Sequence, residues 1–479
     1  MFFAKCLTAL LFAITVCFFL NIGICRANPG IRVQITQKGL NYANNLALRK
    51  MYKELKNYKF PDFSKGGSTS YRLYNIKVSR VSRPRGHIAL VPGQGLRWTV
   101  VIKGYRLSAK FKLKQKVLWF TIRKTFSVTM KVKRVELKFT LKPSKATNGG
   151  LKLKASRCRS KVDVNVSAKN IVLKIILKFF RRKINRIIEK KLCQSATKII
   201  NNDVSRKLAR FPVTRRIKHG YFFDYGFVSN PVFTSNYMQT NHKAAILDKN
   251  KNGQFPFAPP QLPQLNENKK MIYFIISDYV LNTWLYTAYH DNQLWLKVNS
   301  KMFKKENQRA MFQTTCPNSM CIGKILPQIA EKYPNSKMEM HFTTYENPMV
   351  HFKANHVQLN VPVRAEFIVV QANGAHAKLL TAELVLFSEV KTKISGKNLL
   401  LTVSETTLTL KKIYGGAPGS FAMIAVKGAL EMIVKFVESI LPGQQFPLVL
   451  PSHAMLSNPT IRIVQNAIIV ASDLNIKSI

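Results

Sequence analysis

The sequence predicts an α+β protein built from two halves that share one order of elements: a helix, many strands, then a long apolar helix. Two observations lead to this class. Apolar and polar residues alternate with period two over long segments of both halves, as in antiparallel sheets with one buried and one solvated face. Between the halves, four prolines fall within the segment 254–265, and such a run favours an extended, semi-rigid connector.

The first half opens with a predicted helix, because apolar residues recur at near-helical spacing at Leu40, Ala43, Leu46, Leu48 and Met51. A later strand alternates twice with a change of phase between, first at Phe126, Val128, Met130 and Val132, then at Val135, Leu137, Phe139 and Leu141. The second half repeats the alternation at Val357, Leu359, Val361 and Val363, and again at Leu408 and Leu410. We expect curved antiparallel sheets in both halves.

A long helix is predicted after residue 170, with an apolar stripe at every fourth position: Val172, Ile176, Phe180, Ile184, Ile188, Leu192, Ala196, Ile200, Val204 and Leu208. Four residues advance about 400° around an α-helix, so the stripe turns by about 40° at each step. One straight amphipathic helix is therefore excluded: the helix either breaks, for example at Asn201 and Asn202, or curves over successive surfaces. The alternative is a membrane-lytic helix with a basic side at Arg181, Arg182, Lys183, Arg186, Lys190 and Lys191.

The chain carries 76 Lys and Arg against 22 Asp and Glu, a formal charge of +54. The charge is uneven: residues 28–250 hold 51 basic and 8 acidic residues, or +43, whereas residues 251–479 hold 23 and 14, or +9. A field this positive implies an anionic partner: nucleic acid, anionic lipid or a polyanionic cell-surface glycan. With 46% hydrophobic residues, the chain is not a disordered polyelectrolyte.

Residues 1–27 have the pattern of a secretory signal peptide. Lys5 supplies the positive start, a long apolar run follows, and Cys25 and Ala27 provide small residues before a cleavage site. The alternative is an uncleaved anchor, because the apolar run is long and an arginine follows it. Cleavage predicts a secreted, extracellular protein with no role on genomic nucleic acid.

Four cysteines remain outside the signal peptide: Cys158, Cys193, Cys316 and Cys321. An even number in an oxidising compartment indicates disulfides, and four cysteines allow three pairings. Because each half holds two, the economical choice joins Cys158 to Cys193 and Cys316 to Cys321. The rival is a zinc site, but no His pair lies at ligand spacing beside either cysteine pair.

The sequence predicts no catalysis, metal or cofactor. His351 and His356 are five residues apart, so on one strand they face opposite sides and make a poor metal pair. Metalloprotease, nucleophile-elbow and Walker-type motifs are absent, and Gly93 and Gly95 lack the third glycine of a dinucleotide site. A glycosylation sequon begins at Asn165, on the polar face of an alternating segment, which makes Asn165 a candidate glycosylation site.

Several short segments follow one another in a characteristic order: Asn28-Pro29-Gly30, Gln37 to Ala43, Leu90-Val91-Pro92, the pair Cys158 and Cys193, Phe257-Ala258-Pro259-Pro260, and Ser277-Asp278-Tyr279 with Asn282-Thr283. Together they resemble the bactericidal permeability-increasing protein and lipopolysaccharide-binding protein family, over essentially all of residues 28–479. Plasma phospholipid and cholesteryl-ester transfer proteins share the fold of this family, so the resemblance leaves the function open.

The resemblance implies an elongated boomerang of two antiparallel β-barrels, each with a long helix, joined by a central antiparallel sheet with strands from both halves. Each barrel of the family holds a lipid in an apolar pocket, so we expect bound phospholipid here. The resemblance also implies a disulfide from a barrel strand to the long helix, between Cys158 and Cys193, whereas Cys316 and Cys321 have no counterpart. The predicted domains are a signal peptide (1–27), a strongly basic barrel domain (28–250), a Pro-rich linker (251–268) and a second barrel domain (269–479).

The resemblance also suggests a binding site at the tip of the first barrel. The matching segment carries lysines at alternate positions, Lys110, Lys112, Lys114 and Lys116, with Phe111 and Leu113 on the opposite face. Lys65 falls in the neighbouring tip loop. A lysine cluster suits the two phosphates of lipid A, and nearby apolar residues suit its acyl chains. The alternative is a solvated strand edge that lysines protect from aggregation.

These features predict a secreted antimicrobial protein of innate immunity that binds lipopolysaccharide and permeabilises the outer membrane of Gram-negative bacteria. Its expected partners are lipid A, phospholipid, anionic bacterial membranes and sulfated glycans. The alternative is an extracellular phospholipid-transfer carrier whose charge only docks it on anionic particles. The uneven charge favours the first function, because a carrier has little use for +43 in one half.

Overall fold

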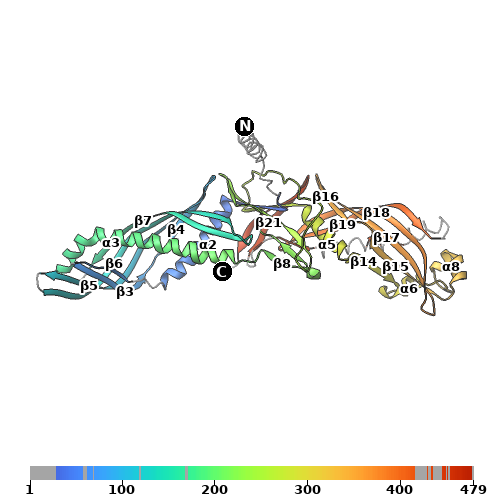
Figure 1. Ribbon diagram of the computed structural model, residues 1–479, viewed down its shortest axis with the longest axis horizontal. Coiled ribbons are helices and arrows are strands. Elements are labelled where there is room, and N and C mark those ends of the chain that lie inside the picture. Colours follow the sequence, from blue (N-terminus) through green and yellow to red (C-terminus); the bar gives the residue numbers. More distant parts are fainter. Residues whose placement is uncertain are drawn as a thin grey trace, which may run out of the picture.

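The computed structural model shows an elongated, slightly bent molecule with a sheet towards each end and a third sheet between them (Figure 1). It describes residues 28–57, 62–67, 69–117, 120–167 and 171–415, and, in the last part of the chain, 429, 433–434, 445–448, 450 and 454–476. The predicted signal peptide (1–27) lies outside the described residues. The described strands pair antiparallel throughout, so the predicted α+β class with antiparallel sheets is confirmed.

The N-terminal sheet consists of long strands from the basic half. Its hydrogen-bonded order is β2-β3-β5-β6-β7, and β4 also pairs with β5. The strands are β2 (Phe63–Lys65), β3 (Thr69–Arg80), β4 (Arg85–Val91), β5 (Gly95–Val117), β6 (Phe120–Lys145) and β7 (Leu151–Ser167). Val128, Met130 and Val132 of β6 are buried, as their alternation predicts.

The change of phase in β6 coincides with a β-bulge. The register of β6 with β7 shifts between Val132 and Arg134, and at the same level of β5 Gly104 adopts a φ of +64°. A bulge adds one residue to a strand, so the apolar positions beyond it return to the inner face of the sheet. Phe139 and Leu141 are buried for this reason.

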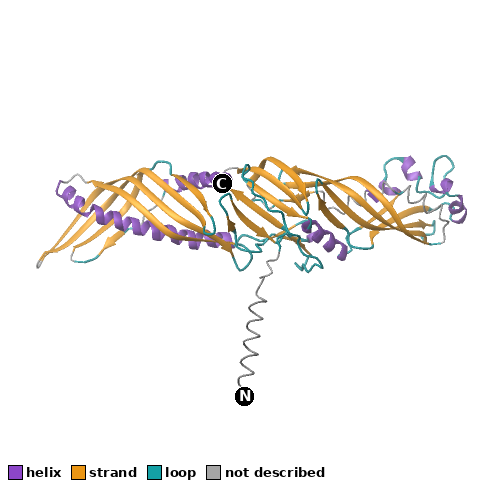
Figure 2. Ribbon diagram, turned by 90° about the horizontal axis from the view of Figure 1, so that it is seen from above, coloured by secondary structure: helices purple, strands orange, loops and turns teal. Residues whose placement is uncertain are grey.

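Two helices pack against the inner face of the N-terminal sheet (Figure 2). Helix α2 (Gln37–Lys56) begins after Thr36, whose Oγ1 accepts a hydrogen bond from the Gly39 N–H at 3.4 Å. Helix α3 (Ile171–Lys198) runs along the sheet and contributes Ile188 and Leu192 to the same apolar core. The predicted first barrel is therefore a curved sheet whose interior is closed by α2 and α3.

The long helix breaks where Asn201 and Asn202 lie. A π-helical segment, η1 (Ile199–Val204), separates α3 from the short helix α4 (Ser205–Ala209). A π turn contains more residues than an α turn, so four residues advance by less than a full turn there. The apolar stripe at every fourth position therefore rotates back towards the sheet. The Asn201 side chain fixes the break on β7, because its Oδ1 accepts a hydrogen bond from the Ala155 N–H at 2.6 Å.

The central sheet joins the two halves in the order β10-β11-β1-β13-β22-β21. The first half supplies β10 (Val232–Phe233), β11 (Tyr237–His242) and β1 (Ile31–Thr36), and the second half supplies β13 (Ile272–Ser277), β22 (Ala467–Ile476) and β21 (Ala454–Val464). The halves meet where β1 pairs with β13, from Ile31 opposite Ile276 to Ile35 opposite Ile272. A small sheet contains β12 (Ala245–Leu247), β9 (Phe222–Asp224) and β8 (Thr214–Arg216), with the short 3-10 turn η2 (Lys218–Gly220) between β8 and β9.

The Pro-rich connector packs along the central sheet. Leu262 and Leu265 are buried in a small core with residues of β13 and β22. Two buried side chains of β1 hold its backbone: Arg32 donates a hydrogen bond to the Pro263 carbonyl at 2.8 Å, and Gln34 donates one to the Leu265 carbonyl at 3.1 Å. The first strand of the chain thus fixes the segment that leads into the second half.

The C-terminal sheet has the order β14-β15-β17-β18-β19-β20, and β16 also pairs with β17. Its strands are β14 (Trp295–Asn299), β15 (Lys337–Thr344), β16 (Met349–Lys353), β17 (His356–Val370), β18 (His376–Ser395), β19 (Asn398–Tyr414) and β20 (Gln445–Pro447). The helices whose bounds lie within the described residues of this half are α5 (Tyr279–His290), η3 (Ser300–Met302), α6 (Glu306–Ala310), α7 (Ile322–Ile325) and α8 (Pro327–Lys332). The predicted residues Val357, Leu359, Val361 and Val363 are all buried. The long apolar helix predicted for this half falls between β19 and β20, largely outside the described residues.

Candidate functional site

Four predicted lysines lie together on the outer face of the N-terminal sheet, and we call them the lysine row: Lys110, Lys112, Lys114 and Lys116. They occupy alternate positions of β5, so Phe111 and Leu113 between them turn inward and are buried. Three of the lysines are exposed and Lys114 is half-buried. Lys110 Nζ donates a hydrogen bond to Ser127 Oγ of β6 at 2.9 Å.

Neighbouring strands add positive charge beside the lysine row. The register pairs Lys112 with Arg72 of β3, and Lys114 with Arg123 of β6. Arg72 is partly neutralised by an ion pair with Asp62, with an N···O distance of 2.5 Å. The row therefore belongs to a wider cationic surface that spans three strands.

Lys65 occupies a different position. It lies in β2, where its backbone pairs with Tyr71 of β3, and Tyr71 pairs in turn with Leu113 of β5. The structure therefore brings the four lysines of β5 together. The backbone of Lys65, two strands away, lies level with Leu113 and not with any of these lysines.

Behind the outer face, an apolar cavity of about 280 Å³ lies between the N-terminal sheet and its two helices. Its walls are inward-facing side chains of α2, β5, β6, β7 and the α3 region, including Met51, Leu55, Ile102, Leu107, Met130, Val132, Leu137, Val164, Leu192 and Ala196. Tyr105 bridges two of these elements, because its hydroxyl donates a hydrogen bond to the Leu55 carbonyl at 3.2 Å. Such an apolar lining suits hydrocarbon chains.

A disulfide holds α3 over this cavity. Cys158 of β7 is bonded to Cys193 of α3, with their Cα atoms 5.7 Å apart. Nearby, Ser160 Oγ donates a hydrogen bond to the Glu189 carbonyl at 2.8 Å, and the Glu189 carboxylate accepts one from the Val162 N–H at 2.9 Å. Further towards the start of the helix, Arg181 forms an ion pair with Asp163 of β7 at an N···O distance of 2.6 Å. The helix is thus attached to β7 by one covalent bond, two hydrogen bonds and this ion pair. A second disulfide joins Cys316 and Cys321 between α6 and α7.

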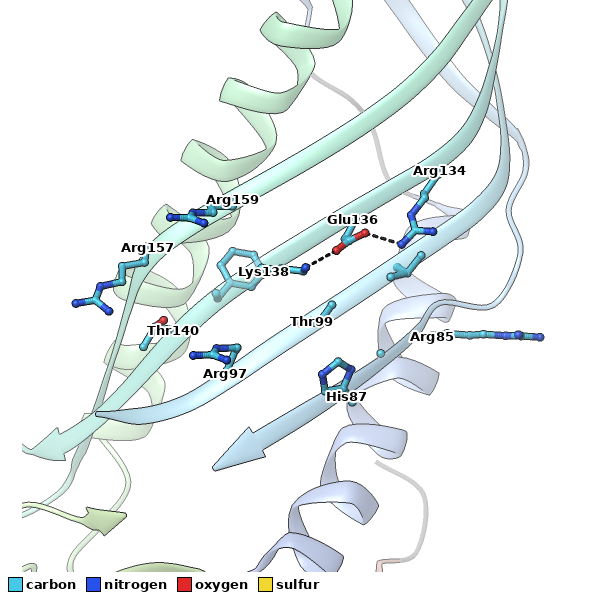
Figure 3. A pocket seen from close by; sticks show the side chains of 13 residues that line it. Arg85, His87, Arg97, Thr99, Arg134, Glu136, Lys138, Thr140, Arg157 and Arg159 are labelled. Atoms are coloured by element: carbon cyan, nitrogen blue, oxygen red, sulfur yellow. Dashed lines mark hydrogen bonds and ion pairs between the residues drawn. The ribbon is translucent and has the colours of Figure 1, made fainter. Parts of the chain in front are cut away.

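A larger recess, of about 830 Å³, lies on the outer face of β4, β5, β6 and β7 (Figure 3). We call it the arginine groove, because its lining includes six cationic side chains: Arg85, Arg97, Arg134, Lys138, Arg157 and Arg159. His87, Thr99 and Thr140 add neutral hydrogen-bonding groups to the lining, and Glu136 adds a carboxylate. The arginine groove is therefore strongly electropositive and polar.

Glu136 organises two of the groove cations. Its carboxylate forms ion pairs with Arg134 at 2.5 Å and with Lys138 at 2.8 Å, and the side chain is only 12% exposed. These hydrogen bonds, first from Lys138 and then from Arg134, lower the pKa of Glu136 to about 2. The carboxylate therefore stays ionised and holds both cations in fixed positions at neutral pH.

The arginine groove could not be recognised in the sequence. Its residues come from four strands between positions 85 and 159, and each one alone resembles an ordinary basic residue of a solvated face. Only the register of the sheet brings them together. In the sequence, Lys and Arg are concentrated at outward positions of the alternating strands. This pattern predicts a basic outer face, but it does not predict where on that face a recess lies.

A second apolar cavity, of about 260 Å³, lies where residues of both halves meet. Leu151, Leu208 and Phe223 of the first half line it together with Leu448 and Leu450 of the second half. His242 is also in its wall, and burial lowers the pKa of this histidine below its usual value. A lipid pocket enclosed by the second barrel itself stays a prediction.

The described residues contain no cluster of three or more His, Cys, Asp or Glu side chains that could hold a metal ion. Within the same part of the chain, none of the helices has the length and apolarity that crossing a bilayer requires.

Comparison with known proteins assigns the chain to a family. Residues 39–203 match the N-terminal domain of the LBP / BPI / CETP family, and residues 215–476 match its C-terminal domain. The chain belongs to the LBP/BPI/CETP family. The resemblance seen in the sequence is thereby confirmed, and the two matches together span both halves of the chain.

Relatives within the LBP/BPI/CETP family are distant but extend over most of the chain. The bactericidal permeability-increasing protein of Rattus norvegicus is 22% identical over 465 residues, which are 94% of each protein. The lipopolysaccharide-binding protein of Mus musculus is 25% identical over 369 residues, or 74% of each protein. A crystal structure of lipopolysaccharide binding protein has a TM-score of 0.56 and 22% identity, covering 94% of this chain and 99% of that one. This last likeness establishes the shared fold.

Proposed function

We propose that this protein is a secreted lipopolysaccharide-binding protein of innate defence, which binds lipid A and permeabilises the outer membrane of Gram-negative bacteria. The observation that carries the proposal is the lysine row, which projects from the outer face of a half with a charge of +43. Lipid A presents two phosphates at a membrane surface, and each Lys or Arg near an anionic surface contributes about 1 kcal/mol of attraction. Relatives named for lipopolysaccharide binding and bactericidal activity support this choice.

The apolar cavity supports phospholipid as a second ligand. Its walls are almost entirely hydrocarbon, and it is closed by helices that a disulfide and hydrogen bonds hold in place. The transfer of acyl chains from water into such a cavity is favourable, because it buries apolar surface. We therefore assign the outer face to the phosphates of lipid A and to anionic bacterial membranes, and the cavity to phospholipid. Sulfated glycans are further expected partners of the basic face.

The same cavity favours one alternative function, an extracellular phospholipid-transfer carrier. A carrier needs an apolar cavity, such as the one observed here, but has no need for a charge that is concentrated on one half. The two functions therefore differ in the interaction that supplies most of the binding free energy. For a lipid A-binding protein it is electrostatic attraction, and for a carrier it is the uptake of acyl chains.

A competition assay separates these functions. Labelled lipid A vesicles are bound by the full mature protein, and unlabelled lipid A or zwitterionic phosphatidylcholine vesicles compete over a range of salt concentrations. The proposed function predicts that lipid A competes far better and that binding weakens steeply with salt, since screening acts over about 8 Å at physiological ionic strength. Equal competition by both vesicle types, with salt-independent transfer of phospholipid, would instead identify a carrier. Dye uptake by Gram-negative cells, with Gram-positive cells as the control, tests permeabilisation.

A further inference from the structure

The C-terminal half carries a small helical cap on its sheet, residues 301–337, which we call the end cap. It contains the short helices α6, α7 and α8, and Figure 1 shows α6 and α8 at the opposite end of the molecule from β5. The end cap is attached to β15, because the Met338 N–H donates a hydrogen bond to the Phe312 carbonyl at 2.7 Å. It therefore forms a surface far from the lysine row.

Three methionines of the end cap project into solvent. Met302 is 55% exposed, Met311 is 41% exposed and Met320 is 62% exposed. Methionine is one of the residue types that are most often fully buried. Three exposed methionines within one short segment therefore indicate a surface that covers its apolar side chains against a partner.

Contacts within the end cap bring the three methionines together. Met302 and Met311 are followed by Phe303 and Phe312, whose ring centroids are 5.2 Å apart. The Met311 carbonyl also accepts a hydrogen bond, at 3.2 Å, from the N–H of Ile322, which lies two residues beyond the third methionine. The exposed methionines therefore belong to one packed unit.

The turn that carries Met320 is fixed at its base. A disulfide joins its two ends, Cys316 and Cys321, and both cysteines are buried. Next to it, Lys324 Nζ donates a hydrogen bond to the Pro317 carbonyl at 3.1 Å. These bonds hold the ends of the turn inside the end cap and leave Met320 on the outside.

Positive charge is concentrated in the same segment. The end cap holds seven basic and two acidic residues, or +5, whereas the other 192 residues of the half 251–479 hold 16 and 12, or +4. Lys301, Lys304 and Lys305 flank Met302 and are exposed, and none of them forms an ion pair with a described residue. The end cap thus places unpaired cations beside exposed apolar side chains.

We infer that the end cap docks on the surface of an anionic lipid bilayer, with its methionines among the acyl chains and its lysines at the headgroup phosphates. Apolar side chains that lie beside Lys and Arg are typical of segments that bind in the interface of anionic membranes. Methionine suits a fluid surface, because its side chain is flexible. Protein–protein interfaces, by contrast, are depleted in lysine. The inference does not rest on the proposed lipid A binding, because the end cap shares no residue with the lysine row.

Methionine oxidation tests this docking in the wild-type protein. Hydrogen peroxide transfers one oxygen atom to an accessible thioether, which becomes a sulfoxide while the peroxide is reduced to water. Met455 of β21 is the matched control, since it is 41% exposed, like Met311, but lies in the central sheet. The full mature protein is oxidised alone, with phosphatidylglycerol vesicles or with phosphatidylcholine vesicles, at about 0.15 M salt. Mass spectrometry of peptides then gives the rate of oxidation at each methionine.

We expect phosphatidylglycerol vesicles to slow oxidation of the three methionines of the end cap by about fivefold or more, and that of Met455 by less than about twofold. Phosphatidylcholine vesicles should protect the end cap less. The same protection should persist in K110E/K112E/K114E/K116E, in which the lysine row no longer attracts an anionic membrane. Loss of lipid A binding by this variant, with protection of the end cap intact, would separate the two sites.

A substitution gives an independent measure. In the protein with the reversed lysine row, M302Q/M311Q/M320Q should weaken binding to phosphatidylglycerol vesicles by about fivefold or more, whereas M455Q should change it by less than about twofold. Should the triple variant fail to fold, the oxidation rates of the wild type still decide the question.

Three outcomes would overturn the inference. Oxidation of the end cap at the same rate with and without phosphatidylglycerol vesicles would show that it does not meet the bilayer. Equal protection of Met455 would show that the vesicles shield the whole molecule. Protection by polyglutamate, but not by vesicles, would assign the end cap to an acidic protein. Failure of the wild type to bind lipid A, with the end cap still protected, would contradict the proposed function and leave this inference standing.

Discussion

Glu136 is a single carboxylate that holds two cations in place on the outer face of the N-terminal sheet. It lies between Arg134 and Lys138 on β6, and its carboxylate is bound to both. Because the pKa of the folded-state carboxyl is lowered to about 2 from 4.5, its stabilising contribution is complete above about pH 4.5. That contribution disappears as the pH falls towards 2, where the folded-state carboxylate also takes up a proton.

The first prediction concerns Glu136→Gln. At pH 7 the variant should have a lower free energy of unfolding than the wild type, by less than about 1 kcal/mol, because the two cations are about half exposed and solvent screens them. The difference should be constant between about pH 7 and 5 and shrink between about pH 4.5 and 2. Urea unfolding at a series of pH values measures it. A difference that grew on acidification, or one unaffected by about 1 M salt, would contradict the assigned ion pairs.

Ala196 allows the apolar cavity to be tested by a single substitution. It belongs to α3 and lines the cavity, whereas Gln194, two residues earlier on the same helix, is exposed and is not part of the lining. The two positions therefore offer one substitution inside the cavity and a matched control outside it.

The second prediction is that Ala196→Phe reduces the phospholipid that co-purifies with the protein by about half or more, because the larger ring occupies space that acyl chains would fill. Gln194→Phe, which introduces the same ring at an exposed position, should leave the lipid content unchanged. Mass spectrometry of the extracted lipid measures both. Equal lipid content in the two variants would place the bound lipid elsewhere.

Among the elements, the attachment of α3 to β7 determines whether the apolar cavity is closed. The disulfide between Cys158 and Cys193 spans 35 residues of chain, whereas the one between Cys316 and Cys321 spans only 5. In the chain-entropy model, the longer loop contributes about 3–4 kcal/mol of stability and the shorter one about 2 kcal/mol.

The third prediction follows from this difference. Replacing both Cys158 and Cys193 by Ala should lower the free energy of unfolding by about 3–4 kcal/mol and increase amide hydrogen exchange in α3. Replacing both Cys316 and Cys321 by Ala should cost about 2 kcal/mol and leave exchange in α3 unchanged. If the first variant kept the exchange protection of α3, the hydrogen bonds around Glu189 and the ion pair between Arg181 and Asp163 would be sufficient to hold the helix.

Much of each element could be predicted from the sequence, because local patterns determine which side of a strand or helix is buried. The alternation in β6 identifies both faces, and its change of phase marks the bulge between Val132 and Arg134. The stripe after residue 170 requires a break or a curve, and the structure has a π turn at Asn201. The arginine groove and the dimensions of the cavity could not be predicted, since both depend on the register of distant strands and on space that side chains leave unfilled.

In the whole molecule, the basic half and the nearly balanced half are joined by one sheet. β1 from the half with +43 pairs with β13 from the half with +9, and the Pro-rich connector is hydrogen-bonded to β1. The positive field is therefore carried at one end of a long molecule (Figure 1). We expect such a distribution to orient the protein, so that its N-terminal sheet meets an anionic surface first.

The most direct test of lipid A binding by the basic half is the affinity for lipid A vesicles after reversal of the lysine row. The variant K110E/K112E/K114E/K116E is compared with K391E/K393E/K411E/K412E, which makes the same change in charge at exposed positions of β18 and β19. Four lost attractions of about 1 kcal/mol each predict nearly a thousandfold weaker binding for the first variant, with much lower salt sensitivity. The second variant should bind within about tenfold of the wild type. A change of less than about tenfold in the first variant, with the fold intact, would show that the lysine row is only a solvated strand edge and contradict the central claim.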